Sequence, residues 1–221
     1  MKKYKILNLY ACLGGNRYKW DEVADNLEVT AVELDEELAK LYQERFPNDI
    51  VIVADAHQYL LNNYKEFDFI WSSPPCPSHS RVRHSQKNRE NIKAIFPSMI
   101  LYEEIIFLDN HFKGKYVVEN VTPYYEPLIL AKKRGRHLYW TNFNLPNNIG
   151  ERKEGNGIIS KAKNEVEALS KFHDYDFNKY KGKQRRDKIA RNLVDYEVGK
   201  TILQTVLGIE KQNNTNQTTM F

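Results

Sequence analysis

The first 120 residues alternate short β-rich runs with helical patterns, and this alternation restricts the fold more than any other feature of the chain. Strands are expected at residues 5–10, 28–33, 50–54, 67–71 and 116–119, and helices at residues 36–46, 57–62 and 97–112. The run at 50–54 (IVIVA) is apolar throughout, which predicts a strand buried on both faces. The alternation predicts an α/β fold: a doubly wound, mostly parallel sheet with helices on both faces. In such sheets, ligands bind beyond the carboxyl ends of the strands.

Composition limits the class of protein. Of the 221 residues 41% are hydrophobic, which is enough for the buried core of one domain. No apolar run approaches the roughly 20 residues that span a bilayer, so no membrane partner is expected. The two cysteines, Cys12 and Cys76, are too few for a disulfide scaffold or a structural zinc site. We therefore expect a cytoplasmic protein without a metal, and the Asn-, Lys- and Ile-rich composition suits a bacterial or phage-infected cell.

Basic residues are concentrated in one segment. Residues 131–191 contain 16 Lys and Arg against 7 Asp and Glu, whereas the rest of the chain contains 17 against 22. A basic segment on an acidic body is typical of proteins that bind a polyanion, although a merely solvated surface has the same composition. We expect nucleic acid as the partner.

Past Pro123 the patterns become looser. Residues 138–140 indicate another strand, and residues 141–181 are rich in Asn, Gly and charge without a long apolar period. Residues 194–207 recover a helical rhythm that predicts a helix packed on the sheet. The tail 209–221 has almost nothing to bury and is expected to be disordered.

A glycine turn and two acids follow the first three expected strands. Gly14 and Gly15 let the backbone approach a ligand, and Glu33 lies 18 residues after Gly15, near the position that binds ribose hydroxyls in nucleotide-binding folds. Asp55 ends the third strand in the same way, although a helix cap explains it equally well on its own. Together these residues fit an adenosyl ligand, and the absence of GxxxxGK[ST] disfavours an ATPase.

A cysteine follows the fourth expected strand in WSSPPCPSHSR. Two prolines fix the backbone before Cys76, and Ser78, His79, Ser80, Arg81 and Arg83 follow it. Polar and cationic neighbours are expected to lower the pKa of the thiol and to favour a nucleophile over a buried structural cysteine. Cys12, inside an apolar strand and turn, is expected to pack.

Ionisable residues also follow the fifth strand. Glu119 emerges from VVENV at the same end of the sheet as Cys76, where a partly buried carboxyl with a raised pKa can serve as an acid or simply cap the next segment. Arg134 and Arg136 lie two residues apart, so in one strand both guanidinium groups would share a face.

These blocks, in this order, resemble those of the DNA cytosine-5 methyltransferase family. NLYACLGG is similar to the first S-adenosylmethionine motif of the family, and AVELD and ADA are similar to its second and third. SPPCPSHS resembles the Pro-Cys catalytic loop, ENV the Glu-Asn-Val motif, and KRGR the arginine motif. RNLVDYEVGKTI resembles the C-terminal motif that completes the cofactor pocket, so the matches cover residues 8–202.

The resemblance implies a Rossmann-like S-adenosylmethionine-dependent methyltransferase fold and methylation of carbon 5 of cytosine in double-stranded DNA. Cys76 would add to carbon 6 of a flipped-out cytosine, Glu119 would hold the ring nitrogen and exocyclic amine, and Arg134 or Arg136 would hold the ring oxygen. The S-adenosyl-L-methionine site would comprise Tyr10, Ala11, Leu13, Gly14, Gly15, Glu33, Leu34, Asp55, Ala56, Pro75 and Asn192. DNA contacts would come from Ser78, Ser80, Arg81 and Arg83, on a loop that closes over the base, and from Asn120.

The resemblance also divides the chain, and it has departures. The expected parts are a cofactor-binding and catalytic core (1–140), a reduced basic target-recognition region (141–185), a C-terminal segment returning to the core (186–208) and the tail. Cys12 and Arg191 replace motif glycines, and the glutamine before the arginine pair is missing. Because the recognition region is so short, we expect low sequence specificity, or recognition completed by a second copy of the chain or by a partner protein.

Three rival functions remain open. Ser73-Pro74-Pro75 resembles a motif of enzymes that methylate exocyclic amines, but Cys76 cannot stack on a base as the aromatic residue of that motif would. The cytosine of RNA is open to the same thiolate addition. A non-catalytic module that binds nucleic acid or cofactor is favoured only by the departures, and the retention of Cys76, Glu119 and both arginines opposes it.

Overall fold

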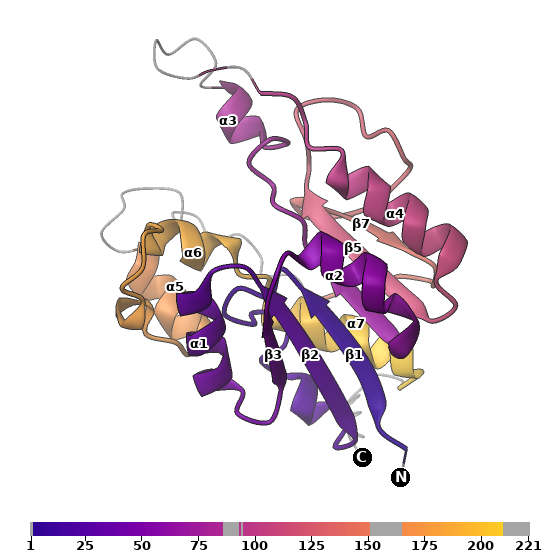
Figure 1. Cartoon of the computed structure of the whole chain (residues 1–221). Helices are drawn as coiled ribbons and strands as arrows, with labels where there is room; N and C mark the ends of the chain where they lie inside the picture. The colour runs from indigo at the N-terminus through magenta and orange to yellow at the C-terminus, as the bar shows by residue number, and fades with distance from the viewer. Residues whose placement is uncertain (1, 86–92, 94, 151–164, 210–221) are drawn as a thin grey trace, which may run out of the picture.

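The computed structural model describes residues 2–85, 93, 95–150 and 165–209. Within these residues, seven strands form one sheet in the order β3-β2-β1-β4-β5-β7-β6 (Figure 1). The first five are parallel: β1 (Tyr4–Leu9), β2 (Leu27–Glu33), β3 (Ile50–Val53), β4 (Phe69–Ser72) and β5 (Lys115–Val121). β7 (His137–Thr141) pairs antiparallel with both β5 and β6 (Lys132–Arg134). The expected doubly wound, mostly parallel α/β sheet is confirmed.

Helices connect these strands and follow them. They are α1 (Glu36–Arg45), α2 (Ala56–Asn63), α3 (Arg81–Ser85), α4 (Ile100–His111), α5 (Glu165–His173), α6 (Arg186–Asn192) and α7 (Tyr196–Leu207), with short 3-10 turns η1 (Trp20–Glu22), η2 (Tyr64–Glu66) and η3 (Phe177–Lys179). The expected helices correspond to α1, α2, α4 and α7. Local chemistry sets their ends: Asp35 caps α1 by accepting from two backbone N–H groups, and Gly208 ends α7 in the left-handed conformation.

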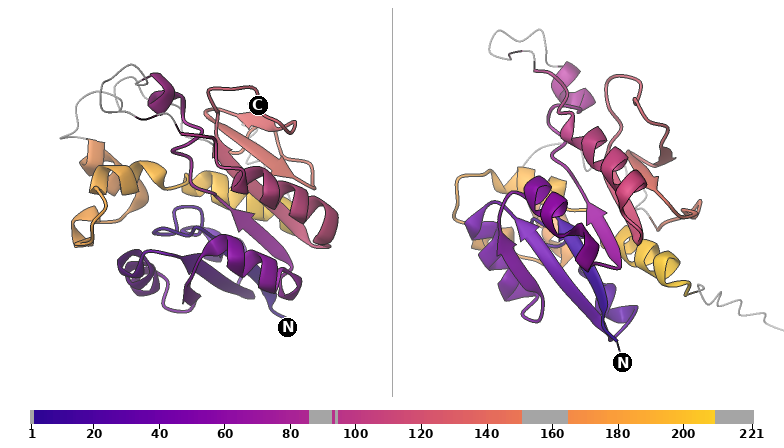
Figure 2. Two further views of the ribbon diagram at one scale, coloured as in Figure 1. Left: turned by 45° about the horizontal axis from the view of Figure 1, so that its top comes forward. Right: turned by 45° about the vertical axis from the view of Figure 1, so that its right-hand side comes forward.

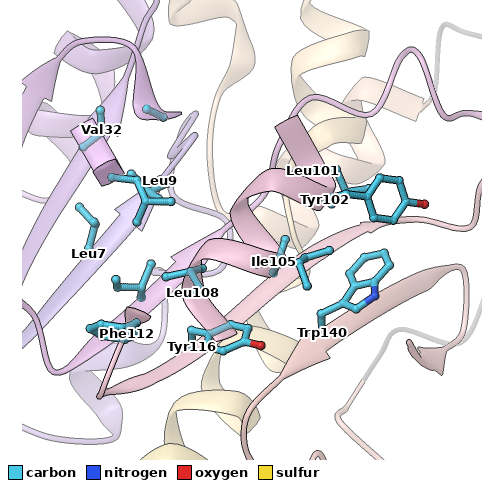
Figure 3. Close-up of a cluster of buried hydrophobic side chains, with 14 of the residues drawn as sticks. Leu7, Leu9, Val32, Leu101, Tyr102, Ile105, Leu108, Phe112, Tyr116 and Trp140 are labelled. Atoms are coloured by element: carbon cyan, nitrogen blue, oxygen red, sulfur yellow. The ribbon is translucent and has the colours of Figure 1, made fainter. Parts of the chain in front are cut away.

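The two faces of the sheet are covered by different helices, because successive side chains of a strand point to opposite faces. Leu7 and Leu9 of β1 pack with α2 and α4, in a cluster that Figure 3 shows with Ile105 and Leu108 of α4. Ile6 points the other way, into a cluster with η1 and α7 that contains the fully buried Trp20 and Trp71. The sheet is therefore the middle of three layers.

The expected double burial of residues 50–54 is wrong. Ile50 is 48% exposed and Val53 is 52% exposed. β3 lies at the edge of the sheet and pairs with β2 alone among the described strands, so an apolar run here does not indicate a central strand.

The looser part of the chain still contributes to the core. Leu169 of α5, Phe177 and Tyr180 pack with Leu13 and with Leu38 of α1. The expected division at residues 140, 185 and 208 stays a prediction, because residues 151–164 fall outside the described part, as does the predicted disorder of residues 210–221. None of the described helices combines the length and apolarity needed to cross a bilayer.

The sheet topology fixes where a ligand can bind. β1 lies between β2 and β4, so the chain adds strands first on one side of β1 and then on the other, and the carboxyl ends at this switch point are the usual ligand site. Figures 1 and 2 show α3 and α6 beyond this end of the sheet, away from the N-terminus.

Candidate active site

The turn after β1 has a strained backbone. Tyr10 and Cys12 have φ of 56° and 48°, and Gly14 has φ of 67°. Residues other than glycine rarely adopt these φ angles, so Cys12 occupies a position where glycine would be unstrained. The Cys12 side chain packs with the cluster around Leu13, as expected, and burial raises the pKa of its thiol to about 12.

Glu33 at the end of β2 holds this turn. Its Oε2 accepts from the Cys12 backbone N–H at 2.8 Å, and its Oε1 accepts from the Asp35 N–H at 2.9 Å. Each carboxylate oxygen retains a further lone pair for a hydroxyl donor. Burial raises the pKa of Glu33, although the bonds from the backbone N–H groups oppose that rise. Glu33 is thus a fixed acceptor for a pair of hydroxyl groups.

Two neighbouring residues complete a site of the right chemistry for adenosine. Leu34 is 68% exposed beside Glu33, an apolar surface open to a flat base. Asp55 is exposed and caps α2 by accepting from the Gln58 N–H at 2.9 Å, so the helix-cap reading is confirmed and its role toward a ligand stays a prediction. The carboxylates of Glu33 and Asp55 and the apolar side chain of Leu34 fit an adenosyl group. Ala56, which follows Asp55, is buried.

The C-terminal segment packs directly on the glycine turn. A Cβ on Gly15 would lie 2.4 Å from the Val194 carbonyl oxygen, just after α6, whereas one on Gly14 would lie 2.4 Å from the ring of Phe46, just after α1. The Gly15 contact brings the end of α6, at the exposed Asn192, to the turn after β1. Of the predicted cofactor residues in the turn, Ala11 and Leu13 have buried side chains, so their backbone is what they offer to a ligand.

The loop after β4 is held at several points. The Asn120 amide donates to the Pro74 carbonyl oxygen at 2.9 Å, and Arg81 Nε donates to the Pro123 carbonyl oxygen at 2.8 Å. Ser78 Oγ accepts from the Ser98 N–H, and Ser80 forms a bridge with Pro123. The loop that carries the half-buried Cys76 is therefore fixed by β5, by the segment after β5 and by Ser98 before α4. Pro75 is exposed, and Arg83 lies in α3.

His79 belongs to the same anchor. Its ring is buried, and Nδ1 lies 2.5 Å from the Tyr125 hydroxyl oxygen. Burial lowers the pKa of His79, which favours the neutral ring. His79 therefore supports the loop and adds no positive charge beside Cys76.

The expected lowering of the Cys76 pKa is wrong. Burial raises the pKa of the thiol, and the negative charge of Glu119 raises it further. The Lys188 side chain of α6 opposes this rise. Arg81, a cation that follows Cys76 in the sequence, turns its Nε to the Pro123 carbonyl oxygen.

Glu119 lies where the sequence predicts it. It is 8% exposed in β5, the strand beside β4, and its charge acts on the Cys76 thiol. A thiol and a buried carboxyl group therefore lie together at the C-terminal ends of β4 and β5. The thiol can act as a nucleophile, and the carboxyl group can form hydrogen bonds with a ligand that has an amide-like edge.

The two arginines do not share a strand face, contrary to expectation. β6 ends at Arg134, and Gly135 and Arg136 form the two-residue turn of a hairpin with β7. The Arg134 guanidinium donates to the carbonyl oxygens of Pro146 and Leu145, at 2.7 and 3.1 Å. The Arg136 carbonyl oxygen accepts from the Thr122 N–H, which sets Arg136 beside the end of β5. Arg136 is therefore exposed beside the end of β5, whereas Arg134 holds the loop 145–147.

The structure adds a carboxylate that the sequence reasoning missed. Glu104 of α4 is fully buried and accepts from the Tyr10 hydroxyl at 2.6 Å and from Ser72 Oγ at 2.5 Å. His57 Nδ1 lies 3.2 Å from the same carboxylate, which raises the pKa of His57. Glu104 thus joins the glycine turn to the strand that leads to Cys76. Its place on the apolar stripe of α4, between Leu101 and Ile105, was the available signal.

Comparisons with known proteins agree with this arrangement. The sequence model of the C-5 cytosine-specific DNA methylases matches residues 4–123, more than half of the chain. The structure of the Entamoeba histolytica methyltransferase EhMeth aligns with 96% of this chain and 100% of its own, with a TM-score of 0.55 and 11% identity, so the two share a fold. A mutant of Spodoptera frugiperda DNMT2 is 25% identical with a TM-score of 0.38, and the alignment covers 54% of this chain but 36% of that one. The chain thus spans about a third of the length of the Spodoptera protein. No curated protein matches it.

Proposed function

The chain belongs to the C-5 cytosine-specific DNA methylase family, and we propose that it methylates carbon 5 of cytosine in double-stranded DNA with S-adenosyl-L-methionine as the donor. The observation that carries the proposal is the placement of Cys76, on the loop that follows β4, near Glu119 of the neighbouring strand β5, so that the carboxylate charge acts on the thiol. A thiol and a carboxyl in this relation suit a cytosine, which offers an electrophilic carbon 6 and a hydrogen-bonding edge.

The chain's own residues would hold the cofactor at the carboxyl ends of β1, β2 and β3. Glu33, whose oxygens accept from the backbone of the turn, would also accept from the ribose hydroxyls, the exposed Leu34 would pack on the adenine, and the exposed Asp55 would accept from its amine. The Tyr10 to Gly15 turn forms the floor of the site. When bound, the cofactor supplies an electrophilic methyl group on a sulfonium.

Cys76 performs the covalent step. Its thiolate adds to carbon 6, and the electrons of the 5,6 double bond become available at carbon 5, which takes the methyl group. Loss of the proton from carbon 5 then restores the double bond and expels the thiolate. Glu119 holds the ring nitrogen and exocyclic amine, and Arg136 holds the ring oxygen, so that the ring accepts electron density as Cys76 adds. Because the reactive carbon is inaccessible in a stacked duplex, the cytosine leaves the helix.

An adduct test separates this function from the rivals. The protein is mixed with a duplex containing 5-fluorocytosine and with S-adenosyl-L-methionine, and covalent complexes are separated on a denaturing gel. Because fluorine cannot leave carbon 5 as a cation, the proposal predicts an adduct with the wild type and none with Cys76→Ser. An unfluorinated duplex is the control for trapping. The absence of an adduct from wild type that binds both ligands would favour a non-catalytic module, and an adduct with RNA alone would change the substrate.

A further inference from the structure

One exposed surface beyond the carboxyl end of the sheet contributes only its last residue, Lys188, to the electrostatics of the site described above. It is formed by residues 179–188 (KYKGKQRRDK), from the end of η3 into α6, and is called here the basic surface. All six of its cations are exposed, and they are Lys179, Lys181, Lys183, Arg185, Arg186 and Lys188. Its one acid, Asp187, pairs with Arg185 at 2.8 Å and with Arg191 at 3.2 Å. Lys181, Lys183 and Arg186 have no carboxylate partner among the described residues.

The backbone beneath these cations is fixed. Tyr180 is 1% exposed, its hydroxyl donates to Asp35 Oδ2 at 2.9 Å, and the Gln184 N–H donates to that hydroxyl. The Gln184 amide donates to the same Asp35 oxygen at 3.0 Å. A Cβ on Gly182 would lie 2.3 Å from the Tyr180 hydroxyl, so the chain wraps tightly around this ring. Basic side chains therefore project from a frame anchored to the N-cap of α1.

The basic surface also contains a cavity. A cavity of about 590 Å³ is lined by Lys181, Arg185 and Arg186, with Asn178 and Gln184 beside them, and the Asp187 carboxylate, which pairs with Arg185, also lies in the lining. Guanidinium and ammonium groups with amides are the side chains that bind phosphate and sugar oxygens. The lining has the chemistry of a site for a nucleic-acid backbone.

The C-terminal end of the basic surface lies toward the reaction centre. Lys188 at its C-terminal end acts electrostatically on the Cys76 thiol. Figures 1 and 2 show α6 at the same end of the molecule as α3, the helix that follows the Cys76 loop. A strand whose cytosine reaches Cys76 would therefore run close to the basic surface.

We propose that the basic surface binds the phosphate backbone of the double-stranded DNA from which the cytosine is taken. The inference rests on the proposed function and adds the surface that replaces a larger recognition domain. Contacts to phosphates position a duplex without reading its sequence, so a chain that depends on them would show low sequence specificity.

The test is the salt dependence of binding. A fluorescein-labelled duplex of about 20 base pairs is titrated with wild type and with the variant Lys181→Gln/Lys183→Gln/Arg186→Gln, without cofactor. The matched control is Lys2→Gln/Lys113→Gln/Lys115→Gln, which removes three exposed cations at the opposite end of the sheet. Thermal melting checks that all three proteins fold.

Each lost phosphate contact should lower the slope of log Kd against log salt by about 0.9 and weaken binding at 0.1 M salt about tenfold. We expect the triple variant to lose about two to three phosphate contacts, with the corresponding fall in the salt slope and in the affinity. The control should have the slope and the affinity of wild type. Equal slopes for wild type and the triple variant would overturn the inference, as would wild type that does not bind DNA or that prefers an RNA duplex of the same sequence. Because no turnover is measured, failure here is distinct from failure of the adduct test.

Discussion

Glu104 provides the sharpest test of what holds the turn after β1 in place. It is fully buried, and it accepts from the hydroxyls of Tyr10 and Ser72, which belong to the turn after β1 and to the end of β4. Hydrogen bonds to a charged acceptor contribute about 1.5–3 kcal/mol each, so Glu104→Ala should lower the free energy of unfolding by about 3–6 kcal/mol. Glu104→Gln keeps the shape and one acceptor oxygen, and we expect a loss of about 1–3 kcal/mol.

The neighbouring residue supplies the control. Glu103 has a side chain 58% exposed and lies 3.6 Å from His57 Nε2, so Glu103→Gln should change stability by about 0.5 kcal/mol or less. Urea unfolding followed by tryptophan fluorescence measures both variants, and calorimetry measures their affinity for S-adenosylhomocysteine. Because Tyr10 lies in the proposed cofactor site, Glu104→Gln should also weaken that affinity. Equal stability and equal affinity for the two glutamine variants would refute the role given to Glu104.

Three other outcomes follow from single residues. Gly15→Ala places a Cβ 2.4 Å from the Val194 carbonyl oxygen, so it should cost about 1–3 kcal/mol of stability and weaken cofactor binding; unchanged thermal melting would contradict the packing. The adduct rate should rise with pH as the Cys76 thiolate forms, and Lys188→Gln, but not Lys188→Arg, should move that rise to higher pH; superimposable pH profiles would exclude the lysine charge. The folded state raises the pKa of His57, so its contribution to stability is present below the unfolded pKa and lost as pH rises through the folded one. The stability difference between wild type and His57→Gln should therefore be larger at about pH 5.5 than at about pH 8.5 in urea titrations, and the reverse order would refute the ion pair.

Features that depend on local periodicity were predictable from the sequence. The strands that became β1, β2, β4 and β5 and the helices α1, α2, α4 and α7 follow their apolar patterns to within a few residues. The family resemblance followed from blocks of residues at strand ends, because a parallel sheet brings those ends together whatever lies between them.

Features that depend on how side chains pack in space were not predictable from the sequence. Counting the cations after Cys76 predicted a lowered pKa for the thiol. Burial and the charge of Glu119 raise that pKa instead, and Lys188, which is far away in the sequence, opposes the rise. The two arginines would share a face only within one strand, and Gly135 between them makes a hairpin turn instead. Glu104 looks like a polar residue of an amphipathic helix until its partners on β4 and the glycine turn are known.

The central claim is that the protein methylates carbon 5 of cytosine in DNA through a covalent adduct between Cys76 and carbon 6. It is tested most directly by nucleoside mass spectrometry of DNA and RNA from a methylation-free bacterial host that expresses the wild type or Cys76→Ala. The account predicts 5-methylcytosine in DNA with the wild type alone. Methyl groups on the exocyclic amine of the base, or 5-methylcytosine in DNA from cells expressing Cys76→Ala, would contradict it.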